Sequence, residues 1–224
     1  MNSNCGVSKS PKLEEDELQV QQLPSVFRMR GLCSSPLWKT EKFQSDMNKL
    51  VANYENILKE FQVVYESETG WSKNETPTGS WCIYPIINQG DLVEENASMC
   101  PQTLETILSL KSLMNLNVFG NATFSVVNPK TSITDHYGPT NIRIRCHLGL
   151  IIPNKCNLRV AGEVVRWKKG DVLLFDDSYK HSVHYEGEGD GIRAILMVDL
   201  WHPDISDSER NSIDYLFSQG NNID

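Results

Sequence analysis

Apolar residues recur at steps of three and four along the first third of the chain, and this spacing predicts an amphipathic helix from Phe43 to Phe61. Residues 62–80 end in a Pro- and Gly-containing stretch and are expected to form a loop. A second helix is predicted at about Thr103 to Met114, because its apolar periodicity is followed by Asn115 and closed at Gly120.

Beyond Gly120 the apolar residues fall in short runs rich in Val, Ile and Leu, separated by Gly, Pro, Asn and Lys. One strand is predicted earlier, at 81–87. The later strands are predicted at 122–127, 141–152, 156–160, 163–167, 171–175, 181–185 and 192–199. Short strands at this density predict an antiparallel barrel or sandwich. We expect residues 1–24 to be a disordered tail, 25–80 an N-terminal segment whose helix packs on the core, and 81–224 the β-domain.

The strand at 141–152 alternates apolar and polar side chains, which point to opposite faces of a sheet. The apolar face holds Ile142, Ile144, Cys146, Leu148 and Leu150, and the other face holds Arg143, Arg145, His147 and Gly149. The alternation leaves two interpretations open. Either the basic face is exposed to solvent, or it lines a cavity that holds an anion.

Composition indicates an ordinary globular domain, with 39% hydrophobic and 22% charged residues among 224. The net charge of −8 argues against nucleic acid as a partner, because phosphate-backbone binding needs clustered Lys and Arg. The six cysteines show no CxxC spacing, so neither a zinc ribbon nor a thioredoxin-like pair is indicated. Whether Cys100 forms a disulfide, and in what oligomeric state the chain exists, stay open.

No run approaches the roughly 20 apolar residues that a membrane helix requires, and Met1 to Leu23 is polar and acidic. We therefore expect no secretory signal and no membrane segment in this chain, which favours a cytoplasmic location. Glycosylation sequons at Asn74, Asn96 and Asn121 conflict with that location. We interpret them as chance matches to a loose motif.

Three residues suggest chemistry. His136 precedes the predicted turn Gly138-Pro139, and His181 follows the turn after Phe175, so two imidazoles can meet at a barrel mouth and bind iron(II). Arg193 is a lone charge in an apolar strand, with no acidic neighbour in sequence. A ligand carboxylate could accept two hydrogen bonds from its guanidinium group.

Long motifs in the β-domain resemble the aspartyl/asparaginyl β-hydroxylase family, and most closely its small members with an aspartate β-hydroxylase domain. They are His136-Tyr137-Gly138-Pro139-Thr140-Asn141, Arg143-Ile144-Arg145-Cys146-His147-Leu148-Gly149-Leu150, Phe175-Asp176-Asp177-Ser178 and Val198-Asp199-Leu200-Trp201-His202-Pro203. The resemblance implies a mainly β fold with flanking helices, a double-stranded β-helix or jelly roll of the 2-oxoglutarate oxygenase and cupin type. It also implies an enzyme that uses iron(II), 2-oxoglutarate and dioxygen to hydroxylate a carbon, releasing succinate and carbon dioxide.

By matching position, the resemblance makes His136 and His181 the metal ligands. It makes Ser125, Arg145, His147 and Arg193 the 2-oxoglutarate contacts, with Arg193 on the distal carboxylate, and it places Trp81 near them. These assignments are expectations for the cavity.

Gly138 stands where a facial triad carries its carboxylate. The family shares this gap, which implies that water fills the vacant coordination position and that Asp177 holds this water in a catalytic role. We expect Asp176, Asp199 and His202 to stabilise turns and close the last strand, and His184 to be structural.

The default substrate is a peptidyl Asp or Asn, hydroxylated at its β-carbon. Larger family members that modify EGF-like domains carry a helical-repeat region and a lumenal cysteine pair, whereas this chain has no helical repeat and only Cys100 in the corresponding loop. Small members are typically membrane-anchored, so the resemblance leaves the compartment open. The alternatives are a catalytically silent binding module, a halogenase that uses the small Gly138 position, and a cupin-type isomerase or metal-binding protein.

Overall fold

The computed structural model describes residues 21–189 and 191–219. Within these residues the larger sheet contains β1 (Leu37–Trp38), β2 (Ser72–Asn74), β3 (Trp81–Asn88), β4 (Asp91–Leu92), β5 (Ala122–Val127), β7 (Arg143–Ile151), β10 (Val172–Phe175) and β12 (Arg193–Trp201). The smaller sheet contains β6 (Ser132–His136), β8 (Cys156–Val160), β9 (Glu163–Val165) and β11 (His181–Tyr185). The helices are η1 (Thr40–Phe43), α2 (Gln44–Ala52), α3 (Tyr54–Ser67), α4 (Glu94–Ser98), α5 (Pro101–Leu108) and α6 (Asp207–Phe217).

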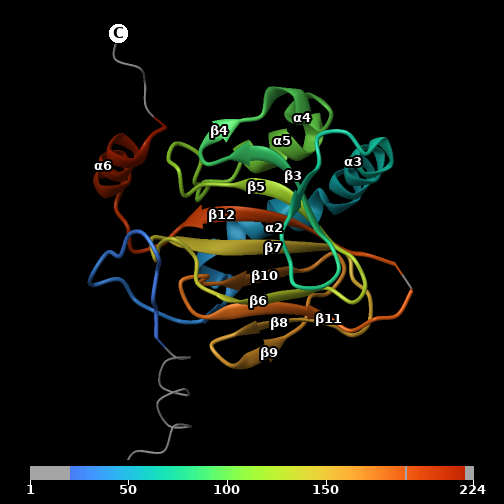
Figure 1. The fold of residues 1–224 in the computed structure, drawn as a ribbon. Helices are drawn as coiled ribbons and strands as arrows, with labels where there is room; N and C mark the ends of the chain where they lie inside the picture. The colour runs from blue at the N-terminus through green and yellow to red at the C-terminus, as the bar shows by residue number, and fades with distance from the viewer. Residues whose placement is uncertain (1–20, 190, 220–224) are drawn as a thin grey trace, which may run out of the picture.

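Both sheets are antiparallel and stack on one another (Figure 1). From β5 onward the chain alternates between them, with β5, β7, β10 and β12 in the larger sheet and β6, β8, β9 and β11 in the smaller. The order β10-β7-β12-β5 faces β6-β11-β8-β9, and this interleaving is a double-stranded β-helix. The predicted fold class, a mainly β jelly roll with flanking helices, is confirmed.

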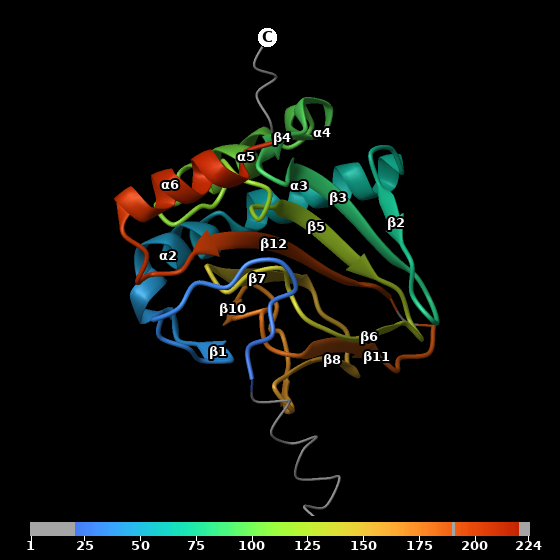
Figure 2. The same cartoon turned by 60° about the vertical axis from the view of Figure 1, so that its left-hand side comes forward.

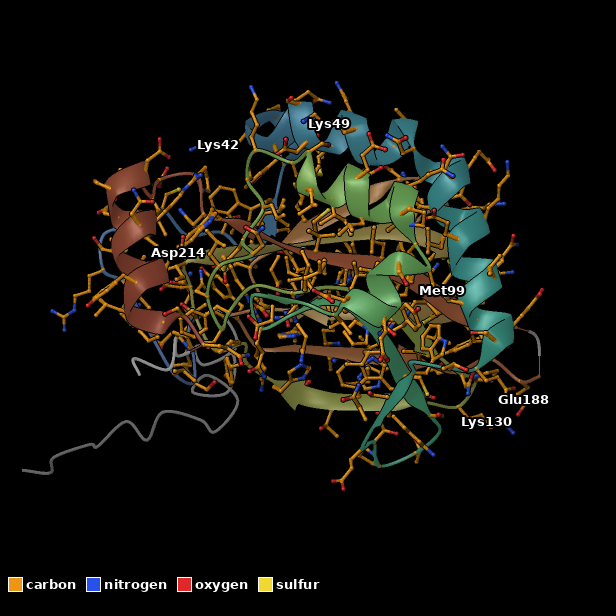
Figure 3. The ribbon with its side chains drawn as sticks, turned by 90° about the horizontal axis from the view of Figure 1, so that it is seen from above. Lys42, Lys49, Met99, Lys130, Glu188 and Asp214 are labelled. Atoms are coloured by element: carbon orange, nitrogen blue, oxygen red, sulfur yellow. The ribbon has the colours of Figure 1, made fainter. Side chains whose placement is uncertain are left out.

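Helices α2 to α5 cover the outer face of the larger sheet, as Figure 3 shows from above for α3, α4 and α5, with Lys49 on α2 at the far edge, whereas α6 lies beside one end of the sheet. One apolar cluster joins Leu50, Ile57 and Phe61 of the helices to Phe124 and Leu148 of the sheet. The even-numbered side chains of β7 belong to this cluster. The odd-numbered side chains of β7 therefore face the smaller sheet, and the polar face of this strand is the inner one.

The predicted first helix is two helices. The chain breaks at Asn53 between α2 and α3, where the Asn53 N–H and side-chain amide both donate to the Lys49 carbonyl. Apolar periodicity survives a one-residue break, so the sequence pattern did not reveal it. Helix α3 also continues to Ser67 and ends at Glu68, which has a left-handed φ of 56°.

The predicted second helix ends earlier than expected, at Leu108. The chain beyond it pairs with the end of β12, where the Met114 N–H donates to the Asp199 carbonyl and the Trp201 N–H to the Ser112 carbonyl. These hydrogen bonds take the place of those that would have continued the helix. Strand β6 and helix α6 were not predicted, because Ser-Ile-Thr-Asp-His offers little apolar alternation and the Ser206–Glu209 capping box precedes a largely polar helix.

The expected tail lies largely outside the described residues, since 1–20 are not among them. Gln22 and Leu23 do contact the β-domain, at Tyr179 and Ser178.

Among the described helices, none has the length and apolar content to cross a bilayer. Cys100 is a buried free thiol.

Candidate active site

Seven of the eight predicted site residues line one cavity between the two sheets. They are Trp81, Ser125, His136, Arg145, His147, His181 and Arg193. Apolar side chains such as Phe175 and Ile195 complete its wall. The jelly roll therefore brings together residues that lie more than 100 positions apart in the sequence.

His136 ends β6 and His181 begins β11, and they face each other as register partners across this strand pair. Their ring centroids are 4.0 Å apart. His136 Nδ1 lies 2.8 Å from the Thr134 carbonyl and His181 Nδ1 lies 2.9 Å from the Tyr179 carbonyl. A carbonyl only accepts hydrogen bonds, so each Nδ1 carries the proton and each Nε2 keeps its lone pair.

His181 is buried and His136 is exposed, so the pair lies at one end of the jelly roll. Burial, with the neighbouring His136, lowers the pKa of His181 to about 4, which keeps this imidazole neutral near pH 7. Two imidazoles whose Nε2 lone pairs are free are suitable ligands for a divalent transition metal such as iron(II).

His147, in the middle of β7, presents a hydrogen-bond donor to the cavity. Its Nδ1 accepts the Trp167 indole N–H at 3.0 Å, so the ring proton is on Nε2. Burial, with the charges of Arg193 and Arg145, holds the pKa of His147 well below its usual range. The Nε2 atom is buried and has no hydrogen-bond partner among the described residues. A ligand oxygen would satisfy this donor.

Arg193 lies at the start of β12, 2% exposed, and no carboxylate pairs with it in the described part of the chain. Its guanidinium donates to the carbonyl and hydroxyl of Ser125 at 3.3 and 3.2 Å and lies 4.9 Å from the Trp167 ring centre. Its Nε is buried and has no hydrogen-bond partner in the part of the chain that the structure describes. Burial lowers the pKa of Arg193 to about 10, so the group stays charged at neutral pH.

Ser125 and Trp81 form the wall beside this arginine. The Trp81 indole N–H donates to the Ser125 hydroxyl at 3.1 Å, and Arg193 donates to the same oxygen. Because the hydroxyl oxygen already accepts twice, its own proton is left to donate. A carboxylate in front of Arg193 could therefore accept from both Arg193 and Ser125.

Arg143 and Arg145 form a buried four-residue network with Asp177 and Asp199. The network contains two cations and two anions, with N···O distances of 2.5 to 3.2 Å. Arg143 also donates to the Phe119 carbonyl. Burial alone would raise the pKa of Asp177, but Arg143 and Arg145 hold it well below its usual range. This network balances its own charge, so the unbalanced positive charge of the cavity lies on Arg193.

Asp177 is not brought into the cavity with the other seven residues. Its carboxylate instead lies against Gly138, where a β-carbon would be 2.4 to 2.6 Å from the carboxylate atoms. The Gly138 N–H donates to the Asp177 carbonyl at 2.6 Å. The space that a triad carboxylate at position 138 would need is thus filled by Asp177, whose charge is neutralised by the two arginines.

Asp199 does more than the expected closure of the last strand, because it is a full member of the buried network. The alternation of β7 had placed Arg143 on the polar face, but nothing in the sequence named its partners.

His202, Cys33 and Asp204 cluster near the surface with potential metal-ligand atoms within 4.8 Å. Both His202 nitrogens are used there, since Nε2 bonds the Cys33 carbonyl and Nδ1 the Asp204 N–H.

The remaining expected structural residues have ordinary partners. His184 bonds the hydroxyls of Ser132 and Ser182, both at 3.2 Å, and does not line the cavity. Asp176 accepts from Gln22 and from Ser178, and so stabilises its turn as expected. Lacking an arginine partner, Asp176 has a pKa that burial raises to about 7, opposite in direction to Asp177.

Comparison with known proteins shows the family of this chain. The model of the Aspartyl/Asparaginyl beta-hydroxylase family matches residues 47–203. The chain is 44% identical over 206 residues to human aspartate beta-hydroxylase domain-containing protein 2, covering 89% of this chain and 56% of that protein. It is 31% identical over 196 residues to human aspartyl/asparaginyl beta-hydroxylase, covering 84% of this chain and 26% of that protein.

A solved structure of a 2OG-Fe(II) oxygenase family oxidoreductase from Burkholderia pseudomallei aligns with 80% of this chain and 96% of its own, with a TM-score of 0.48 and 10% identity. The chain spans about half the length of the human domain-containing protein 2. The matched span of residues 47–203 contains every residue that lines the cavity. The chain therefore belongs to the aspartyl/asparaginyl β-hydroxylase family.

Proposed function

We propose that this protein is an iron(II)- and 2-oxoglutarate-dependent hydroxylase that acts on the β-carbon of an Asp or Asn residue in a peptide or protein. The observation that carries the proposal is the set of unsatisfied groups in one cavity. They are two imidazole lone pairs at one end and buried donors on His147 and Arg193. Buried polar groups without partners are rare, and ligands commonly supply the partner.

The cavity is suited to a dicarboxylate that reaches from one end to the other. His181 begins β11, whereas Arg193 begins β12 after the turn that follows β11, so the two residues lie at opposite ends of the strands. Arg193 and Ser125 would hold the distal carboxylate of 2-oxoglutarate. His147 would donate its Nε2 proton to an oxygen of the same ligand, and Trp81 would orient Ser125.

His136 and His181 would hold the iron, and their backbone-bonded Nδ1 atoms fix the orientation of both rings. Bound iron(II), with 2-oxoglutarate and dioxygen, supplies the oxidising power that hydroxylates a C–H bond and releases succinate and carbon dioxide. The buried walls around Phe175 and Ile195 exclude water from this chemistry.

Asp177 acts in this proposal as a positioning residue for the open coordination position beside Gly138. The Asp177 carboxylate already fills the space that a side chain at position 138 would need, which leaves little room there for a chloride ligand. We therefore prefer hydroxylation over the halogenase alternative. The peptide substrate is inferred from the relative named aspartyl/asparaginyl beta-hydroxylase.

Succinate formation tests the proposal. The purified protein is incubated with iron(II), 2-oxoglutarate, oxygen and a peptide library, and succinate is measured. His181→Ala should abolish turnover, because one of only two protein ligands is lost. His184→Ala is the matched control, since this histidine is on the same strand but outside the cavity, and it should retain turnover.

A binding measurement separates a silent module from a misassigned site. Calorimetry with zinc(II), which has no redox chemistry, reports 2-oxoglutarate binding without turnover. Binding that depends on Arg193 but produces no succinate would indicate a catalytically silent module. Absence of both binding and turnover would contradict the assignment of the cavity.

A further inference from the structure

The N-terminal strap, defined as residues 21–36, crosses the end of the jelly roll where the two histidines lie. Figure 2 shows it passing in front of the ends of β7 and β10. Its backbone N–H groups donate to the two turns that carry the histidines. Leu23 donates to the Ser178 carbonyl at 2.9 Å, Ser25 to Gly138 at 3.1 Å, and Val26 to Pro139 at 2.9 Å.

This placement limits how a substrate can approach, and the argument here rests on the proposed function. If 2-oxoglutarate occupies the Arg193 end of the cavity, a peptide must reach the metal from the end that carries His136, the exposed ligand. The residues that flank the hydroxylated one then lie against the strap. The chemistry of the strap therefore contributes to the choice of peptide.

A polar cavity separate from the cosubstrate cavity opens beside the strap, between it and the two turns. Gln22, Asn141 and Tyr179 line its inner side. Asn141 holds the strap in place, since its side chain accepts from the Met29 N–H at 2.8 Å and donates to the Met29 carbonyl at 2.9 Å. The shape of this cavity is thus fixed by hydrogen bonds that do not depend on a ligand.

Arg28 and Arg30 line the same cavity, and both are exposed. Neither forms an ion pair within the described residues, and the lining includes no Asp or Glu. Asp176 lies behind Gln22, buried, with its oxygens bonded to Gln22 and Ser178.

Two lysines near the strap already have acidic partners. Lys180 pairs with Asp135 at 3.6 Å, and Lys42 pairs with Asp204 at 3.4 Å. Within residues 21–189 and 191–219, the guanidinium groups of Arg28 and Arg30 thus have no ion-pair partner at the proposed substrate end, in a protein whose net charge is −8. Guanidinium groups bind carboxylates through paired hydrogen bonds.

We propose that Arg28 and Arg30 form a subsite for an Asp or Glu side chain that flanks the target residue in the peptide substrate. The subsite selects peptides by charge, separately from the metal and the cosubstrate, and it makes acidic segments the preferred substrate class.

Fluorescence anisotropy with two pools of short labelled peptides tests this proposal. Both pools contain a central Asp, and their flanking positions carry either Asp and Glu or the neutral Asn and Gln. With zinc(II) and 2-oxoglutarate present, the acidic pool should bind about three- to tenfold more tightly, the range expected for two exposed ion pairs. The preference should weaken at high salt.

The double variant R28Q/R30Q should bind both pools equally. The control is K168Q/K169Q, which removes the same charge from exposed residues outside this cavity and should keep the preference. Loss of the preference in both variants would indicate a general charge effect and overturn the subsite. So would equal binding of the pools by the unaltered protein, binding of neither pool, or a preference that survives R28Q/R30Q.

The outcome is independent of catalysis, because zinc(II) supports no turnover. A preference that depends on Arg28 and Arg30, found together with no succinate formation, would retain the subsite and reject the hydroxylase. Succinate formation without any preference for the acidic peptides would support the hydroxylase and reject the subsite.

Discussion

The larger sheet carries a pair of arginines, Arg143 and Arg145, and a single arginine, Arg193, and the pair and the single residue differ in whether carboxylates balance their charge. Arg143 and Arg145 share two carboxylates, Asp177 and Asp199, at short distances. Arg193 is as buried as Arg143 but has only neutral neighbours in the described residues, among them Ser125 and Trp167. A buried charge needs compensation, and the pair finds it within the chain. Arg193 indicates where a ligand is required.

The largest expected effect comes from breaking the balanced set. Asp199→Asn leaves Arg143 and Arg145 with one carboxylate between them, and should lower the free energy of unfolding by about 3–5 kcal/mol. Denaturant titration measures this. The control is Asp204→Asn, which removes an exposed carboxylate paired with Lys42 and should cost under about 1 kcal/mol. Similar decreases in the free energy of unfolding of both variants would show that the buried network contributes no more to stability than an exposed ion pair.

Arg193→Met tests the other side of the comparison. No carboxylate loses its partner, so the free energy of unfolding should not fall, whereas affinity for 2-oxoglutarate should fall about 100-fold, as for loss of a charged hydrogen-bonding partner. Calorimetry and denaturant titration report the two quantities separately. A loss of stability as large as that of Asp199→Asn would contradict the ligand-binding assignment.

Gly138→Ala tests the link between the balanced set and the metal position. The added β-carbon would lie 2.4 Å from Asp177 Cγ, so the network must shift, at an expected cost of about 1–3 kcal/mol. In an Asp177→Ala background the same substitution should cost less, and a double-mutant cycle measures the difference. Additive effects would mean that the two residues do not compete for this space.

The smallest effect is expected for Ser125→Ala. It removes one neutral donor beside Arg193 and should weaken 2-oxoglutarate binding about three- to tenfold, as expected for one hydrogen bond. Calorimetry under the conditions used for Arg193→Met provides the comparison. A loss as large as that of Arg193→Met would make Ser125 an equal partner in binding.

The sequence predicted most of the fold because period-two and period-3.6 patterns report which faces are buried. Strand 122–127 and the core of 141–152 follow such patterns and are found as β5 and β7. Strand β6 was missed, although it carries His136, because its polar side chains give no alternation. Its place in the sheet comes from pairing with β11, which local sequence does not encode.

Seven residues of the cavity lining were predictable through the family resemblance, but the partners of those residues were not. Trp167, which orients His147 and stacks near Arg193, lies in no motif that the sequence offered. Asp199 was expected to close a strand and instead neutralises two arginines. Such contacts depend on sheet register, which here joins residues 20 to 56 positions apart.

The strap has a consequence for how the protein is made. The Gln22 side chain bonds Asp176, 154 residues later in the chain, and the Leu23 backbone bonds Ser178. During synthesis the N-terminal segment emerges early, yet its docking surface exists only after the turn before His181 has been translated. Contacts of such long sequence separation form late in folding. We therefore expect the end of the jelly roll that carries both histidines to be closed late in folding, by the first described residues of the chain.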